Sequence, residues 1–191
     1  IFRSIRMISE IGKTEGERKE LARYFSPAVV DAIIQKDSTL PQLKDGKRHQ
    51  IAVLFADIRS FTTLSEKMPV TEIAQMLSEL RQFQIEAVFQ NDGMVDKFMG
   101  DAIMAVFGAP HSSGSFTLDV QNAVRAGLSM HSSLVKFNAA REAKGEIPIR
   151  FGIGIHAGEA FVGNLGGAGQ LEYTVIGDAV NTASRIEHLC K

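Results

Sequence analysis

Two short apolar segments, residues 94–99 and 102–107, are separated only by the dipeptide Gly100-Asp101. Strand-sized apolar segments that are joined by a two-residue, glycine-containing connection predict a β-hairpin. A hairpin makes its two strands antiparallel neighbours in one sheet, and every other element has to be placed around them. This pattern narrows the possible topologies more than any other in the chain.

One amphipathic helix is predicted before the hairpin in the sequence and another after it. Residues 71–90 and residues 117–140 each place apolar side chains at intervals of three and four residues, which is the spacing of one helix face. The positions predicted to be buried are Ile73, Leu77, Leu80, Phe83, Ala87 and Val88 in the first helix and Val120, Val124, Leu128 and Val135 in the second.

Strand-like segments complete the order of elements. Residues 50–56 predict a buried strand before the first helix, and residues 150–155, 160–162 and 171–176 predict strands after the second. A last helix begins near Asp178. The order β-α-β-β-α-β predicts an α+β fold with a ferredoxin-like βαββαβ core. We expect a palm-like antiparallel sheet with helices on one face, extended by extra strands and a C-terminal helix.

The start of the chain has a different character. Residues 1–25 are polar and predict a linker helix, a Ser-Pro pair opens a short helix over residues 26–35, and residues 36–48 are a charged loop. We therefore divide the chain into a linker helix and lead-in segment, residues 1–48, and a folded domain, residues 49–191.

The composition excludes some classes of partner. The 191 residues carry a formal net charge of −1, which gives no overall field for a nucleic acid or an acidic membrane. The one cysteine, Cys190, has no partner for an intrachain disulfide, which favours a reducing, cytoplasmic compartment. No apolar run approaches the ~20 residues of a membrane span, so we expect any membrane attachment to come from a module upstream of Ile1.

Two aspartates are predicted to meet at one end of the sheet. Asp57 follows the strand over residues 50–56, and Asp101 lies in the hairpin turn. In a split βαβ arrangement the third strand lies between the parallel first and second strands, so the end of the first strand lies beside that turn. Aspartate is also common in turns, but two adjacent carboxylates repel each other and favour a divalent cation with oxygen ligands.

Four longer segments resemble a known family. The segments are LFADIRSFTTLSE, VDKFMGDAIMAVFGAP, FGIGIHAGEAFVGNLG and YTVIGDAVNTASRIE. They resemble, in the same order, the signature segments of class III adenylyl and guanylyl cyclases, and they extend over roughly residues 50–188.

The resemblance implies a metal site and a phosphate site. Asp57, Asp101 and the backbone carbonyl of Ile58 match the ligands of two divalent cations, Mg²⁺ or Mn²⁺. Serine stands in the phosphate loop where the family often has glycine, which restricts the backbone there. The residues that match the phosphate-binding site are Ser60, Phe61, Thr62 and Gly100.

The resemblance assigns the last helix to the ribose and the transition state. Asn181 matches the residue that orients the ribose, and Arg185 matches the one that stabilises the pentavalent transition state. The two residues are four apart, so they lie on one face of a helix. Arginine suits this role because its planar donors stay charged.

Lys97 and Thr174 match the pair that reads the purine. A lysine donates a hydrogen bond, and adenine N1 accepts one whereas guanine N1 donates; guanylyl cyclases of the family usually carry glutamate at this position. Thr174 can accept from the exocyclic amine of adenine. The Lys/Thr pair resembles that of bacterial-type adenylyl cyclases. The alternative for Lys97 is a counter-charge to Asp96 or Asp101.

The resemblance also implies a head-to-tail homodimer with shared active sites. One subunit would supply the metal ligands and the other would supply the purine, ribose and transition-state residues. The implied reaction is the conversion of ATP to cyclic AMP and pyrophosphate, in the cytoplasm, for signal transduction. The family continues beyond the last helix with further strands and a phosphate-binding lysine, so we expect the domain to be incomplete at its carboxyl end.

Other functions stay open at this point. A guanylyl cyclase is possible, although Lys97 argues against it. A non-catalytic, regulatory cyclase-like domain is also possible, although such domains usually lose a metal aspartate or the transition-state arginine. A diguanylate cyclase would carry a GGDEF-type hairpin, and the hairpin here reads MGDA.

Overall fold

The computed structural model describes residues 15–16, 46–110, 112–167 and 170–190. The linker helix predicted over residues 1–25 lies outside the described residues except for Glu15 and Gly16, which are helical. The short helix predicted over residues 26–35 also lies outside them. Of the charged loop predicted over residues 36–48, residues 36–45 lie outside the described residues. Its end is wrong, because Lys47 and Arg48 already belong to the first strand.

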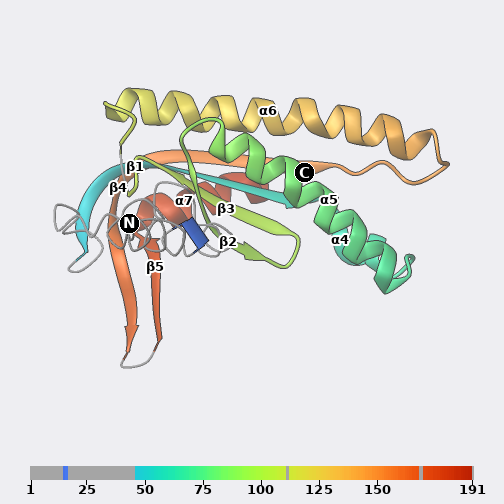
Figure 1. The fold of residues 1–191 in the computed structure, drawn as a ribbon, viewed down its shortest axis with the longest axis horizontal. Helices are drawn as coiled ribbons and strands as arrows, with labels where there is room; N and C mark the ends of the chain where they lie inside the picture. The colour runs from blue at the N-terminus through green and yellow to red at the C-terminus, as the bar shows by residue number, and fades with distance from the viewer. Residues whose placement is uncertain (1–14, 17–45, 111, 168–169, 191) are drawn as a thin grey trace, which may run out of the picture.

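The core of the fold is an antiparallel sheet of five strands in the order β2-β3-β1-β4-β5 (Figure 1). The central strand β1 pairs with β3 on one edge and with β4 on the other. Strands β1 and β2 are therefore parallel, with β3 between them, as the split βαβ pattern predicts. The strands are β1 (Lys47–Ile58), β2 (Met94–Met99), β3 (Ala102–Phe107), β4 (Phe151–Gly167) and β5 (Gln170–Ile176).

Helices cover both faces of the sheet. Helices α5 (Val70–Phe89) and α6 (Phe116–Glu142) pack on one face, and α7 (Asp178–Leu189) packs on the other; Figure 1 shows α6 and α7 on opposite sides of β4. Successive residues of a strand point to opposite faces. In β1, Leu54 accordingly packs with α5 and α6, whereas Val53 packs with Ala183 of α7. No helix in the described ranges is long and apolar enough to cross a membrane.

The central strand explains why the sequence forms a sheet here. All six residues from Ile51 to Ala56 are at most 8% exposed. A strand with neighbours on both edges and helices on both faces needs apolar side chains at every position, not at alternate ones. The continuous apolar run in the sequence meets that requirement, and the predicted fold class is confirmed.

Two predictions about the elements are wrong. The strands predicted over residues 150–155 and 160–162 are parts of one long strand, β4. In α6, Val124, Leu128 and Val135 are 45%, 63% and 59% exposed, although they were predicted to be buried. The buried face combines Met130 and Leu134 with small residues, which let the helix backbone approach the sheet closely. Its buried small residues are Ala123, Ala126 and Gly127.

Candidate active site

Asp57 and Asp101 meet at one end of the sheet, as predicted. The register that pairs Ala56 with Ile103 brings the end of β1 beside the β2–β3 turn. The pKa of Asp101 is raised to about 6. Burial is the largest cause, and a side-chain hydrogen bond with Asp57 and repulsion from the Asp57 charge add to it. Hydrogen bonds from the backbone amides of Asp101 and Ile58 oppose this shift. The pair has the electrostatic character of a cation site, because a divalent ion would remove the repulsion.

The donor set around this pair fits a hard divalent cation that also binds substrate. Within the described ranges, no group of three or more His, Cys, Asp or Glu side chains could hold a metal. Further ligands would therefore be the backbone carbonyl of Ile58, water and substrate phosphates. Mg²⁺ is commonly held in this way, by one or two carboxylates together with phosphate oxygens.

The loop after Asp57 turns sharply at Ser60. This residue has φ 56° and ψ 34°, in the left-handed region that favours glycine. The short helix α4 (Phe61–Ser65) follows it without a side-chain cap. Phe61 packs in the apolar cluster that contains Ile58, whereas Ser60 and Thr62 are exposed. Phe61 thus anchors the loop by packing, and its neighbours stay open toward a ligand.

The two residues predicted to read the purine converge on one carboxylate. Thr174 Oγ1 donates a hydrogen bond to Asp96 Oδ2 at 3.0 Å, and Lys97 Nζ lies 3.5 Å from the same oxygen. Strands β2 and β5 are the two outer strands of the sheet, so this contact depends on the curvature of the sheet. Lys97 thus also has the counter-charge that the alternative interpretation expected.

The last helix presents Asn181 and Arg185 to solvent. Both side chains are exposed, while Ala179, Ala183 and Glu187 are buried on the side that faces the sheet. Among the described residues, no ion pair involves Arg185, and neither residue is bonded to Asp57 or Asp101. The structure therefore does not bring the Asp57–Asp101 pair and these two residues together within one chain.

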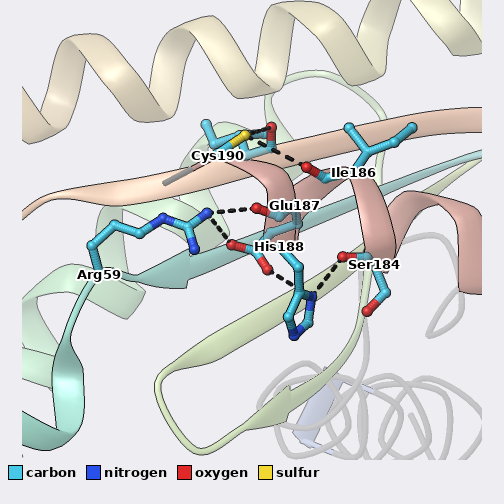
Figure 2. Close-up of polar contacts among 7 residues, drawn as sticks. Arg59, Ser184, Ile186, Glu187, His188 and Cys190 are labelled. Carbon is cyan, nitrogen blue, oxygen red and sulfur yellow. Dashed lines mark hydrogen bonds and ion pairs between the residues drawn. The ribbon is translucent and has the colours of Figure 1, made fainter.

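Arg59, two residues after Asp57, is bonded to the end of α7 (Figure 2). Arg59 Nη2 donates to the backbone carbonyl of Glu187 at 2.6 Å and to its carboxylate at 2.5 Å. The Glu187 side chain is 3% exposed and that of Arg59 is 23% exposed. This ion pair joins the segment that holds Asp57 to the helix that carries Asn181 and Arg185.

Two glycines of β4 leave space for the Arg59–Glu187 ion pair. A Cβ at Gly152 would lie 1.5 Å from Arg59 Nη2, so a side chain there would displace the guanidinium. At Gly154 a Cβ would lie 2.3 Å from the backbone nitrogen of Glu187 and 2.4 Å from the carbonyl of Ala183. The alternating glycines therefore allow both the arginine and the helix backbone to approach the strand closely.

Comparison with known proteins decides the family. Residues 43–191 match the family described as "Adenylate and Guanylate cyclase catalytic domain". The chain belongs to this family. The resemblance of the four signature segments is thus confirmed, and the two aspartates lie at the end of the sheet of a cyclase catalytic domain.

Curated cyclases share the sequence over most of this chain. It is 38% identical over 144 residues to Adenylate cyclase 1 of Rhizobium meliloti (strain 1021), which is 75% of this chain and 21% of that protein. It is 39% identical over 146 residues to Adenylate cyclase of Anabaena cylindrica, 74% of this chain and 28% of that protein. The chain therefore spans less than a third of the length of these relatives.

Solved cyclase structures share the fold. The adenylyl cyclase CyaB from P. aeruginosa is 33% identical with a TM-score of 0.72, covering 76% of this chain and 74% of that one. The guanylyl cyclase Cya2 is 35% identical with a TM-score of 0.70, covering 75% of this chain and 72% of that one. Cyclases named for either purine share the fold, so the purine has to be argued from side chains.

Sequence reasoning missed two contacts near the predicted site residues: the Arg59–Glu187 ion pair and the hydrogen bond from Thr174 to Asp96. The partners lie 128 and 78 positions apart in the chain for the Arg59–Glu187 and Asp96–Thr174 contacts. One signal could have indicated the first contact. Glycines inside a predicted strand mark a close approach of other groups, and residues 152 and 154 are both glycine.

The Arg59–Glu187 pair is expected to contribute more to stability than a surface pair. Arg59→Ala leaves the buried Glu187 carboxylate without its arginine, and we expect it to lower the free energy of unfolding by about 3 kcal/mol. Arg48→Ala is the matched control, because Arg48 pairs with Glu159 at 3.0 Å where the side chains are 80% and 52% exposed. Its expected cost is below about 1 kcal/mol. Urea unfolding measures both, and equal costs would contradict the assigned role of burial.

Proposed function

We propose that this domain is an adenylate cyclase that converts ATP to 3′,5′-cyclic AMP and pyrophosphate for intracellular signalling. The observation that carries the proposal is the contact between Asp57 and Asp101 at the end of β1 in a cyclase catalytic domain. The names of the relatives from Rhizobium meliloti and Anabaena cylindrica agree with this activity. ATP as substrate and the free cysteine Cys190 favour a cytoplasmic location.

The reaction needs positioning and charge stabilisation more than a protein nucleophile. Asp57, Asp101 and the carbonyl of Ile58 would hold two divalent cations, Mg²⁺ or Mn²⁺. When bound, such ions lower the pKa of an attacking hydroxyl and neutralise the triphosphate. The ribose 3′-oxygen forms a bond to the α-phosphorus as the bond to the β-phosphate oxygen breaks. Pyrophosphate leaves, and the hydroxyl proton passes to solvent.

The remaining side chains hold the other parts of the substrate. Ser60 and Thr62 lie exposed next to the metal pair and would contact the phosphates, with Gly100 in the facing turn. Asn181 would orient the ribose, and Arg185 would stabilise the negative charge that spreads over the phosphate oxygens.

Adenine selectivity is assigned to Lys97 and Thr174. The lysine offers only hydrogen-bond donors, which suits N1 of adenine and not N1 of guanine. The threonine oxygen would accept from the exocyclic amine. Their convergence on Asp96 supports a shared role, because two residues that read one ring have to lie close together.

A head-to-tail homodimer with two shared sites accounts for the separation of the groups. The metal pair lies at the end of β1, whereas Asn181 and Arg185 project from the solvent side of α7. A second copy of the chain would bring its α7 and purine residues to the metal pair of the first.

Product analysis tests the activity. We expect cyclic AMP from ATP, with Mg²⁺ or Mn²⁺, and at least about tenfold less cyclic GMP from GTP, because two hydrogen bonds are mismatched with guanine. Cyclic GMP as the main product would assign the domain as a guanylyl cyclase. No product from either nucleotide would indicate a regulatory domain without catalysis.

Mixing two inactive variants tests the shared sites. Asp57→Ala removes a metal ligand and Arg185→Ala removes the transition-state cation, so each homodimer is expected to be inactive. In a mixture, each heterodimer holds one intact site, in which the Arg185→Ala chain supplies Asp57 and the Asp57→Ala chain supplies Arg185. We expect cyclic AMP synthesis to return toward about a quarter of the wild-type rate for random pairing, since half of the dimers hold one intact site of two. Activity that stays at the level of the single variants would contradict the shared arrangement.

A further inference from the structure

A buried carboxylate, Asp96, contacts both residues that are proposed to read the purine. Its side chain is 0% exposed, and one oxygen, Oδ2, both accepts the hydrogen bond from Thr174 and lies 3.5 Å from the Lys97 ammonium. Asp96 is at a register shift of the β2–β3 ladder, between Val95 and Lys97. Such bulges re-aim a side chain out of the regular alternation of a strand. At this bulge the Asp96 carboxylate contacts both the neighbouring Lys97 and Thr174 of β5.

A threonine hydroxyl alone cannot distinguish adenine from guanine. The hydroxyl carries one proton to donate and two lone pairs to accept with. Adenine presents an amine donor at ring position 6, and guanine presents an oxygen acceptor at the same position. A free hydroxyl would rotate to satisfy either base, so a threonine at this site needs a second group to decide its direction.

The contact with Asp96 supplies that direction. An ionised carboxylate only accepts hydrogen bonds, so the single hydroxyl proton of Thr174 is donated to Asp96. Thr174 is 5% exposed, which limits the competition from water for this proton. The Lys97 ammonium lies 3.5 Å from the same oxygen and supplies a counter-charge to the carboxylate. Only the lone pairs of the threonine oxygen then remain for a ligand.

We propose that Asp96 is a specificity-determining residue, which fixes the Thr174 hydroxyl as a hydrogen-bond acceptor and so selects adenine over guanine. This inference rests on the proposed function, in which Lys97 and Thr174 contact the purine. Lys97 is then donor only and Thr174 acceptor only, which matches N1 and the amine of adenine. Guanine meets a mismatch at both positions, a donor against Lys97 and an acceptor against Thr174. Asp96 acts through these residues and does not itself touch the base.

The test is the ratio of kcat/KM for ATP to kcat/KM for GTP. Asp96→Asn replaces an acceptor by a group that can also donate, so the threonine hydroxyl is free to turn. We expect the ATP/GTP ratio to fall about tenfold, the worth of one hydrogen bond of fixed polarity. Asp92→Asn is the matched control, because Asp92 is exposed, precedes the same strand and has φ 55°, which asparagine tolerates. Its ratio is expected to stay within about twofold of the wild type.

A double-mutant cycle separates this role from a structural one. Thr174→Val removes the hydroxyl, and in that background Asp96→Asn is expected to change the ATP/GTP ratio by less than about twofold, because its effect acts through the hydroxyl. A merely structural role for Asp96 would lower the rates with both nucleotides and leave the ratio unchanged. An unchanged ratio in Asp96→Asn therefore overturns the inference.

Variants of Thr174 provide a second test of the same inference. If Asp96→Asn does not fold, Thr174→Ser and Thr174→Val decide instead. The serine hydroxyl also donates to Asp96 and should keep the ATP/GTP ratio, whereas valine should lower it, and equal ratios in the two overturn the inference. A wild-type chain that does not prefer ATP overturns the proposed function itself. A wild-type chain that prefers ATP while Asp96→Asn keeps the same preference overturns only the role of Asp96.

Discussion

The rest of the structure depends on the register of β1. This strand is hydrogen-bonded on both edges and covered on both faces, and its six residues from Ile51 to Ala56 are buried. A slip of one residue would exchange the side chains of its two faces. It would also separate Asp57 from Asp101, because the contact follows from the pairing of Ala56 with Ile103. The packing of the core therefore holds two repelling carboxylates together.

The same strand end connects Asp57 and Asp101 with the rest of the candidate site. Arg59 stands two residues after Asp57, and its guanidinium reaches across Gly152 to Glu187 at the end of α7. In the proposed dimer, α7 of one chain completes the active site whose metals the other chain holds. The Arg59–Glu187 pair thus fixes the helix that serves one site to the segment that serves the other.

Much of this arrangement could be predicted from the sequence because it follows from local patterns. The hairpin 94–99 and 102–107, the continuous apolar run of β1 and the meeting of Asp57 with Asp101 all follow from strand length and topology. The inward face of α6 was not predicted from Val124, Leu128 and Val135, which are exposed. The helix meets the sheet through Met130 and through the small residues Ala123, Ala126 and Gly127. The Asp96–Thr174 contact could not be predicted either. It joins the two outer strands of the sheet and depends on a bulge and on sheet curvature, neither of which has a local pattern.

The metal role of Asp57 and Asp101 is tested most directly by Mn²⁺ binding, measured by electron paramagnetic resonance in the presence of an ATP analogue that cannot cyclise. We expect Asp57→Asn and Asp101→Asn each to weaken Mn²⁺ binding by about tenfold or more, while Asp92→Asn leaves it unchanged. Binding by the wild type should also weaken as the pH falls below about 6, because Asp101 takes up its proton there. Mn²⁺ binding that is equally tight in the wild type and in both aspartate variants would contradict the claim that this carboxylate pair is the metal site.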